Sequence, residues 1–448
     1  MQRRFTLAHS RCGFGAAVAA LIAGAALSCG NDGSPRGASA VRSLPSFSGI
    51  ASCANLECEV ATCPNGGTTT ISGVAYSPSA TDGDPLFDAI VYVPNTALDP
   101  FPAGVACDQC GALISGSPLV TARTDARGKF ALKGVPAGVD IPLVIQMGRW
   151  RRQVTIPVVK PCEDTALPRE LTRLPRNKRE GDIPQYAIST GAADALECVL
   201  RKIGIDDAEF TASSGNGRVH IYPQNGAVLA NAEPASTLWG DDATLAKYDM
   251  VIFDCEGGQF EKPTDAKDRL VRYTANGGRV FASHFSYVWL YDAAPFSGTA
   301  KWASDRQESA AYVYASIDTS FDRGAAFADW LNYVGAALPG DQMALEEPRF
   351  DTLQTYAPAQ RWVYATQPNS VEEYTFDTPV GAPAAQQCGR VAFSDFHVTL
   401  DTVGPDVPFP TECSTGPLSP EEKSLEFMLF DLASCIHPPG QPGAVVTK

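Results

Sequence analysis

Residues 248–284 read YDMVIFDCEGGQFEKPTDAKDRLVRYTANGGRVFASH, and this stretch decides the fold. YDMVIFD (248–254) is a continuous apolar run of the kind that is buried in parallel sheets. A helical pattern over 265–276 follows and ends at two glycines, which suits a helix C-terminus. RVFASH (279–284) has the pattern of a second strand. The order strand, helix, strand predicts one unit of a parallel sheet.

The same alternation continues on both sides of this stretch. It predicts an α/β domain over 185–437 with a doubly wound, mostly parallel sheet. A segment at about 299–388 interrupts the pattern, and we expect an inserted α+β subdomain there. The other predicted elements are strands at 185–190, 218–222, 361–366, 371–380 and 389–398, and helices at 193–204, 324–336 and 420–435, the last capped by Ser419.

The chain before this domain has a different pattern. Short runs with alternating apolar residues are separated by turn sequences, and no helical period is present. We therefore expect an antiparallel β-sandwich over 64–165, and we interpret the charged residues 166–184 as a linker. Six strands are predicted, at 68–76, 88–94, 119–125, 129–135, 141–147 and 151–158.

Composition limits the classes of protein to which the chain can belong. It has 448 residues, of which 44% are hydrophobic and 19% charged, which excludes a disordered chain and a coiled coil. A length of 448 residues suggests more than one core. The net charge of -15 makes nucleic acid an unsuitable partner, because an acidic surface repels phosphate.

The first residues indicate export from the cytoplasm. Three arginines precede a mostly apolar run of about fifteen residues, which is too short to span a bilayer. The run ends at Ala-Leu-Ser-Cys29, which resembles a bacterial lipoprotein signal. The resemblance implies removal of residues 1–28, a lipid on Cys29, and a place in the cell envelope on a bacterial membrane. Residues 29–63 are then interpreted as a flexible tether, and 438–448 as a tail.

Cysteine is frequent, with 13 residues in the chain. An oxidising compartment makes most of them disulfide candidates, and an odd number remains once Cys29 is lipidated. We expect pairing within each domain, which leaves one thiol over in the second half. The pair Cys107–Cys110 has C-x-x-C spacing, for which a structural disulfide in a loop is expected rather than zinc or redox chemistry. The candidates are Cys53, Cys58, Cys63, Cys107, Cys110, Cys162, Cys198, Cys388, Cys413 and Cys435.

Chemically reactive side chains follow the predicted parallel strands, whose carboxyl ends share one edge of the sheet. In one hypothesis, Cys255 is a nucleophile, His284 or His397 is its base, and Asp395 orients the base. In a second, His284 and His397 bind a metal with Asp254 or Asp395. In a third, Cys255 is a buried disulfide partner, for example of Cys198, and both histidines are structural.

Two family resemblances extend these predictions. The run TDARGKFALKGVPAGVDIPLVI (124–145) is similar to carboxypeptidase regulatory-like, transthyretin-type sandwiches, which implies an accessory module without catalytic residues. The runs YDMVIFD, NGGRVFASH and GRVAFSDFH resemble the class I glutamine amidotransferase-like and ThuA-like α/β superfamily. In the amidotransferases the nucleophile is a cysteine in a G-x-C-x-G elbow. Here Asp254 and Glu256 flank Cys255, and no His-x-Glu motif follows, which argues against amidotransferase chemistry.

We expect a monomeric, non-catalytic envelope protein that binds a saccharide or a protein partner and uses no cofactor. The alternative is a hydrolase of amide or ester bonds. Aromatic residues are dense in and around the inserted segment, where they suit an ordinary core better than a platform for sugar rings. They are Trp302, Tyr312, Tyr314, Trp330, Tyr333, Trp362 and Tyr364.

Overall fold

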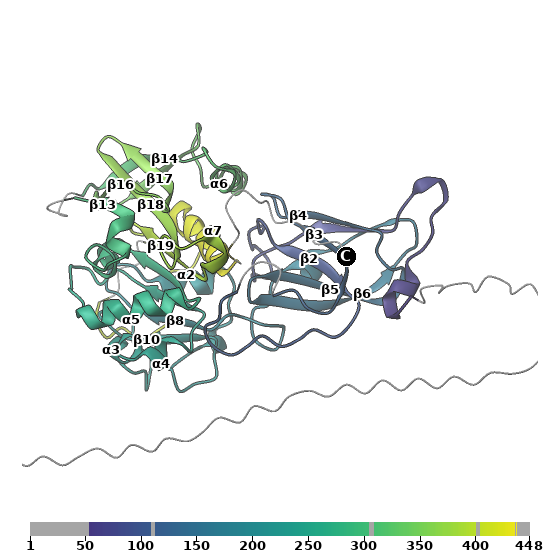
Figure 1. The fold of residues 1–448 in the computed structure, drawn as a ribbon, viewed down its shortest axis with the longest axis horizontal. Coiled ribbons are helices and arrows are strands. Elements are labelled where there is room, and N and C mark those ends of the chain that lie inside the picture. The colour runs from purple at the N-terminus through teal and green to yellow at the C-terminus, as the bar shows by residue number, and fades with distance from the viewer. Residues whose placement is uncertain (1–52, 109–112, 304–308, 400–403, 435, 437–448) are drawn as a thin grey trace, which may run out of the picture. The chain divides into compact units, whose positions relative to one another are not determined.

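The computed structural model describes residues 53–108, 113–303, 309–399, 404–434 and 436 (Figure 1). All of them belong to one compact unit that begins at Cys53. The predicted signal segment, the lipidation at Cys29 and the tail at 438–448 lie outside the described residues, as do Cys110 and Cys435.

The first part of the chain forms two β-sheets, with strand orders β4–β1–β7 and β3–β2–β5–β6. The described pairings are antiparallel except that of β1 with β7, a parallel pairing that the sequence did not predict. Apolar residues from both sheets, such as Val93 and Leu132, share one buried core. The strands are β1 (Thr70–Val74), β2 (Ile90–Pro94), β3 (Pro118–Arg123), β4 (Lys129–Lys133), β5 (Gly138–Met147), β6 (Trp150–Val159) and β7 (Asp164–Ala166).

The rest of the chain is built on a sheet of ten strands in the order β15–β14–β17–β18–β19–β12–β11–β8–β10–β9. The six strands from β19 to β9 are parallel, as predicted. β8 is the first strand of this sheet in chain order, β10 pairs with one edge of it, and β11 pairs with the other edge. The strand order therefore reverses between β8 and β11. These six strands are β8 (Tyr186–Ser189), β9 (Phe210–Thr211), β10 (Val219–Tyr222), β11 (Met250–Phe253), β12 (Arg279–Ser283) and β19 (Gly389–Ser394).

The inserted segment continues this sheet instead of forming a separate subdomain. Strand β18 pairs antiparallel with β19, and β17, β14 and β15 follow outward. Backbone hydrogen bonds therefore join the insertion to the parallel strands. The added strands are β14 (Tyr312–Ile317), β15 (Gln342–Glu346), β17 (Gln360–Thr366) and β18 (Asn369–Thr378); β13 (Ala300–Trp302) and β16 (Thr352–Thr355) form a separate pair.

Alternate residues of the central strands point to opposite faces of the sheet. Ile188 and Ile252 belong to a core that also holds Leu429 of α7, whereas Val251 belongs to a second core with Leu270 of α5. Helices thus cover both faces, as the doubly wound prediction requires. The helices are α1 (Arg169–Thr172), α2 (Leu196–Lys202), α3 (Ala235–Trp239), α4 (Asp242–Leu245), α5 (Thr264–Ala275), α6 (Asp322–Tyr333) and α7 (Pro420–Ala433).

The two β-sheets of the first part and the ten-stranded sheet are tightly connected. The guanidinium of Arg149, after β5, contacts Asp249, just before β11, at 2.5 Å. A disulfide joins Cys107 to Cys388, and one hydrophobic cluster contains residues of both parts. The expectation that disulfides stay within each domain was therefore wrong.

The predicted tether and linker are ordered where the structure describes them. Cys63 is bonded to Cys162, and Cys53 to Cys58, so the segment after Cys53 is held by two disulfides. In the linker, Leu174 is fully buried. These segments pack against the folded unit instead of acting as flexible spacers.

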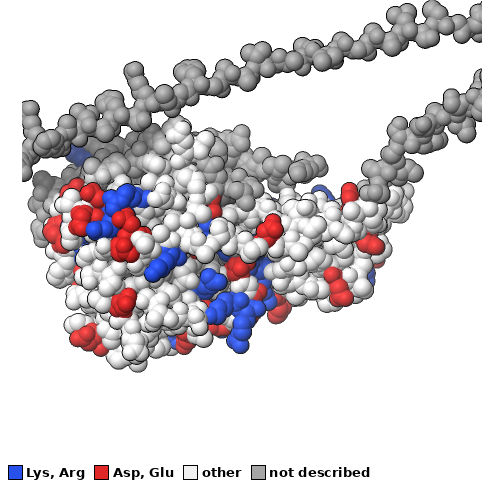
Figure 2. Space-filling model, turned by 60° about the horizontal axis from the view of Figure 1, so that its bottom comes forward, with Lys and Arg blue, Asp and Glu red and all other residues white. Residues whose placement is uncertain are grey.

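The surface carries charges of both signs. On the face drawn in Figure 2, basic and acidic side chains lie next to one another and uncharged residues cover much of the area. Within the described residues, no helix combines the length and the apolar character needed to cross a membrane.

Candidate metal centre

Cys255 lies at the point where the strand order of the parallel sheet reverses, two residues beyond the end of β11. Its carbonyl accepts a hydrogen bond from the amide of Ala193 at 3.1 Å. A side chain at Gly191 would meet that carbonyl at about 2.1 Å, so the close approach of the two loops requires glycine there. Crevices at such reversal points are the usual ligand sites of open α/β sheets.

His284 is the first residue after β12, and it has an unusual backbone conformation. Its φ of 48° lies in the left-handed region, a backbone conformation that residues other than glycine rarely adopt. This turn brings Nδ1 of His284 to 3.2 Å from Sγ of Cys255. Strained residues of this kind concentrate at functional sites.

His397 follows β19, and its ring lies on that of His284, with ring centroids 3.9 Å apart. Its Nδ1 lies 2.8 Å from Oε2 of Glu347, while its Nε2 is buried and has no hydrogen-bond partner. Glu347 comes directly after β15 and also has a left-handed φ, of 46°. The side chain of Glu347 is 59% exposed, so the cluster begins just beneath the surface.

Cys255, His284 and His397 form a compact set of potential metal ligands. One sulfur or nitrogen atom from each residue lies within 4.8 Å of the other two. The three residues are 0%, 6% and 7% exposed, respectively. Sulfur and imidazole nitrogen together are a donor set that suits zinc and neighbouring transition metals.

This environment favours the neutral forms of the thiol and of the adjacent imidazole. Burial raises the pKa of Cys255 to about 12, and the nearby Asp194 adds to the effect. Burial, followed by His397 and Arg349, lowers the pKa of His284 well below its usual range. Activated cysteine nucleophiles have lowered pKa values instead, so the thiol shows no sign of activation by His284.

Asp194 holds the loop that carries His397. Its Oδ1 accepts a hydrogen bond from the amide of Thr399 at 2.9 Å, and its Oδ2 accepts one from Val398 at 3.4 Å. Burial raises the pKa of Asp194 to about 6. Asp194 therefore acts on the site through the backbone that follows His397.

The structure places the other proposed site residues elsewhere. The carboxylate of Asp395 accepts hydrogen bonds from the amides of Asp351 and Thr352, at 2.9 and 3.1 Å, and the described contacts do not include His397. Asp254 faces Glu197, and burial and that neighbour raise its pKa well above the usual range. Glu347, which the sequence interpretation missed, takes the place beside His397 that had been proposed for Asp395.

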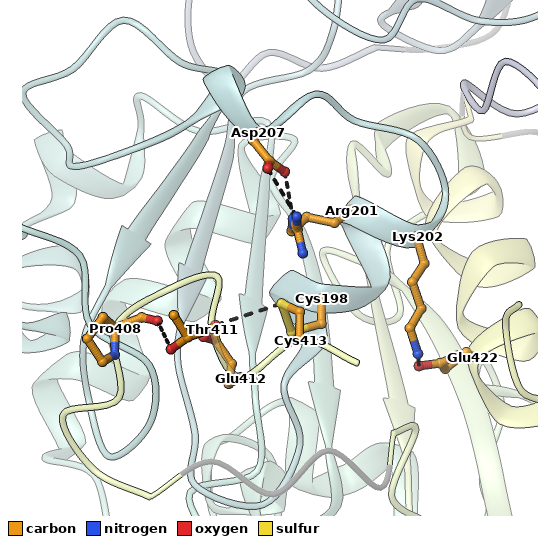
Figure 3. The surroundings of a disulfide bond; sticks show 9 residues. All are labelled: Cys198, Arg201, Lys202, Asp207, Pro408, Thr411, Glu412, Cys413 and Glu422. Atoms are coloured by element: carbon orange, nitrogen blue, oxygen red, sulfur yellow. Dashed lines mark hydrogen bonds and ion pairs between the residues drawn. A yellow bond between two sulfur atoms is a disulfide. The ribbon is translucent and has the colours of Figure 1, made fainter. Parts of the chain in front are cut away.

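Among the described cysteines, the disulfides leave one unpaired. Cys198 of α2 is bonded to Cys413, so the hypothesis of a bond between Cys198 and Cys255 was wrong, and Cys255 is a free, buried thiol. Figure 3 shows this disulfide, with Arg201 reaching Asp207 and Lys202 reaching Glu422 beside it. Cys107 is bonded to Cys388, so the predicted disulfide within the C-x-x-C pair was wrong.

Comparison with known proteins found matches among solved structures. Neither a family model nor a curated protein matches the chain. Among solved structures, a protein from Salmonella typhimurium described as cytoplasmic matches 55% of this chain and 98% of its own, with 12% identity and a TM-score of 0.29. A protein from Bacteroides uniformis described as ThuA-like matches 55% and 91%, with 9% identity and a TM-score of 0.30.

Proposed function

We propose that the chain is a metal-binding protein in which Cys255, His284 and His397 hold one zinc ion. The observation that carries this proposal is the convergence of the three donor atoms within 4.8 Å in a buried site. Three protein ligands with sulfur and imidazole donors are one of the sets that zinc uses, and a fourth position then remains for water or substrate.

The surroundings of both histidines support this assignment. If Nδ1 of His397 donates its hydrogen to Glu347, the buried Nε2 has a lone pair directed into the protein with nothing to bind. His284 itself presents Nδ1 to Sγ of Cys255 at 3.2 Å. Metal-binding histidines usually make contacts like that of His397 with Glu347 through their second nitrogen, because these contacts fix the tautomer and the ring orientation.

Metal analysis tests the proposal directly. The full chain is stripped with a chelator, reloaded with zinc and passed through a desalting column. We expect about one zinc ion per chain, and a large loss in Cys255→Ser and His397→Ala. The matched control is His220→Gln, because His220 is also buried but contacts Tyr248 instead of the cluster.

Cobalt supplies an independent readout of the sulfur ligand. Co²⁺ bound by a thiolate gives a charge-transfer band in the near ultraviolet, and this band is expected in the wild type but not in Cys255→Ser. A zinc content near zero after reloading, or an equal content in the wild type and both cluster variants, would overturn the proposal.

Hydrolysis is a second candidate function, and the three-ligand set is the observation that favours it. A fourth, non-protein position is typical of catalytic zinc, where the bound water loses a proton near neutral pH. We expect zinc-dependent cleavage of an activated ester, measured as initial rates, that is absent in His397→Ala. Equal rates with and without zinc would rule this function out.

We further propose that the protein acts in the cell envelope, anchored through a lipid on Cys29. The positive segment, the apolar run and the Cys29 motif support this, as do four disulfides among the described cysteines. The two-sheet first part is then an accessory module, as its likeness to carboxypeptidase regulatory-like sandwiches implies. Metabolic labelling with a fatty-acid analogue is expected to mark the wild type, and an equal label on Cys29→Ser would contradict the anchor.

A further inference from the structure

We infer that the open face of strands β14, β15 and β17 binds a neutral glycan chain. Tyr312 and Tyr314 of β14 are 52% and 55% exposed, although alternate residues of the same strand are buried. Their rings lie 5.0 Å apart and edge to face. Among the described residues, the ring contact of each of these tyrosines is with the other one.

The register of the sheet shows what surrounds the two rings. Residues directly opposite each other on paired strands share a face. Tyr312 is opposite Glu346, and Ser316 is opposite both Gln342 and Tyr364. The face therefore combines two exposed aromatic rings, set edge to face, with carboxylate, amide and hydroxyl groups, and these are the groups that contact the apolar ring faces and the hydroxyls of sugars.

Charge favours a neutral ligand over an acidic one. The Arg361 guanidinium lies over the Tyr364 ring, 3.7 Å from its centroid, and is paired with Asp318 at 2.8 Å. Glu346 leaves negative charge on the face, which would repel an anionic polymer. From Tyr312 to Ser316 the strand extends about 14 Å, which is long enough for more than one sugar ring.

The face is also continuous with the metal centre along the chain. Strand β15 ends at Glu346, and the next residue, Glu347, contacts His397. A chain bound along the tyrosines would thus lie beside the edge where the metal centre approaches the surface. The glycan surface itself uses no metal ligand, so its test does not depend on zinc.

Calorimetric titration of the full chain with cellohexaose, maltohexaose and chitohexaose tests the inference, with hexagalacturonate as an acidic probe. We expect binding of at least one neutral hexasaccharide, and affinity about 3- to 10-fold lower in both Tyr312→Ala and Tyr314→Ala. The matched control is Tyr333→Ala, because Tyr333 is 53% exposed but lies on α6. Cys255→Ser should bind the glycan as the wild type does.

Three outcomes would overturn the inference. They are the absence of binding to all three neutral hexasaccharides, tighter binding of hexagalacturonate, and unchanged affinity in both tyrosine variants. Since the two tyrosines are exposed, the variants are expected to fold, and circular dichroism checks this. If the protein binds zinc but no glycan, the inference about the glycan surface is wrong and the proposed metal centre is unaffected. If it binds the glycan but no zinc, the proposed metal centre is wrong and the glycan surface is unaffected.

Discussion

Two buried polar clusters in this molecule differ in whether their groups have partners. In the first, Asp431 of α7 forms ion pairs with both Arg323 and Arg390. Each arginine also pairs with a second carboxylate, which is Asp88 for Arg323 and Asp377 for Arg390. In the second, at the strand ends, His397 has a buried nitrogen without a partner, and the Cys255 thiol faces a neutral imidazole. The central groups of both clusters are buried, but only in the first cluster does each of the named groups have a partner. We call the first cluster complete and the second incomplete.

The difference separates a structural role from a functional one. In the first cluster burial raises the pKa of Asp431, but Arg323 and Arg390 outweigh it and hold the pKa below its usual value. The carboxylate is therefore charged and stabilised by its neighbours. A buried polar atom without a partner costs free energy instead. In the second cluster such an atom belongs to one of three residues whose potential metal-ligand atoms lie within 4.8 Å of one another, and the proposed metal ion would supply its partner.

The largest expected effect is in the complete cluster. Asp431→Asn removes the buried charge between two partly buried arginines and should lower the free energy of unfolding by about 3–5 kcal/mol. Urea denaturation followed by tryptophan fluorescence measures this. The matched control is Asp329→Asn, because the Asp329–Arg127 pair is exposed and should contribute less than about 1 kcal/mol.

The result would break the comparison if Asp431→Asn unfolded at the same urea concentration as Asp329→Asn. The complete cluster would then add nothing to stability, and completeness would not mark a structural role. Equal slopes of the two denaturation curves are required for this reading, because a changed slope reports a change in the exposed surface.

The second prediction concerns the incomplete cluster. Zinc at 100 times its dissociation constant should stabilise the wild type by about 2.7 kcal/mol, because it binds the folded state. Cys255→Ser should lose most of this increment, whereas His220→Gln should keep it even if its own stability changes. The increment is the difference between urea midpoints, converted to free energy, with zinc and with chelator. An equal increment in Cys255→Ser would show that zinc stabilises the chain elsewhere.

Sequence reasoning located the parallel strands and the convergence of Cys255, His284 and His397 for one physical reason. Continuous apolar runs mark buried strands, and the carboxyl ends of parallel strands must meet at one edge. Each of the three residues directly or closely follows β11, β12 or β19. Their proximity is therefore a consequence of topology, which the pattern of the sequence contains.

Glu347 and the disulfide partners could not be predicted in the same way. Glu347 reaches His397 from a left-handed turn after an antiparallel strand that joins the sheet through β14. Cys107 and Cys388 are 281 positions apart, and their bond connects parts that the sequence pattern separates. Both contacts depend on how distant segments pack against each other. The hydrophobic periodicity of the sequence contains no information about such packing.

The third prediction uses a buried carboxyl group outside both clusters. Glu373 accepts hydrogen bonds from Ser394 and Ser424, and burial raises its pKa to about 7 from the ordinary 4.5. Because the folded state holds this proton more tightly, the group favours folding below pH 4.5, and that contribution is lost as the pH rises to about 7.

Glu373→Gln keeps the shape of the side chain and removes the titration. The variant should match the wild type near pH 4.5 and exceed its stability at neutral to alkaline pH by about 3 kcal/mol. Paired urea curves at the two pH values measure the difference, in which other titrating groups cancel. A difference that does not change with pH would show that Glu373 keeps its charge in the folded state.

The smallest expected effect tests whether stability and the metal centre are separable. Ser419 caps α7, as predicted: its hydroxyl accepts a hydrogen bond from the amide of Glu422, whose carboxylate accepts one from the amide of Ser419. Ser419→Ala should cost about 1 kcal/mol, and Ser419→Thr, which keeps the hydroxyl, should cost less. Because α7 carries Asp431 but no metal ligand, zinc affinity should stay constant while stability falls. A parallel loss of zinc affinity would mean that the complete cluster and the incomplete cluster are coupled, and that the strand-end residues depend on α7 for their positions.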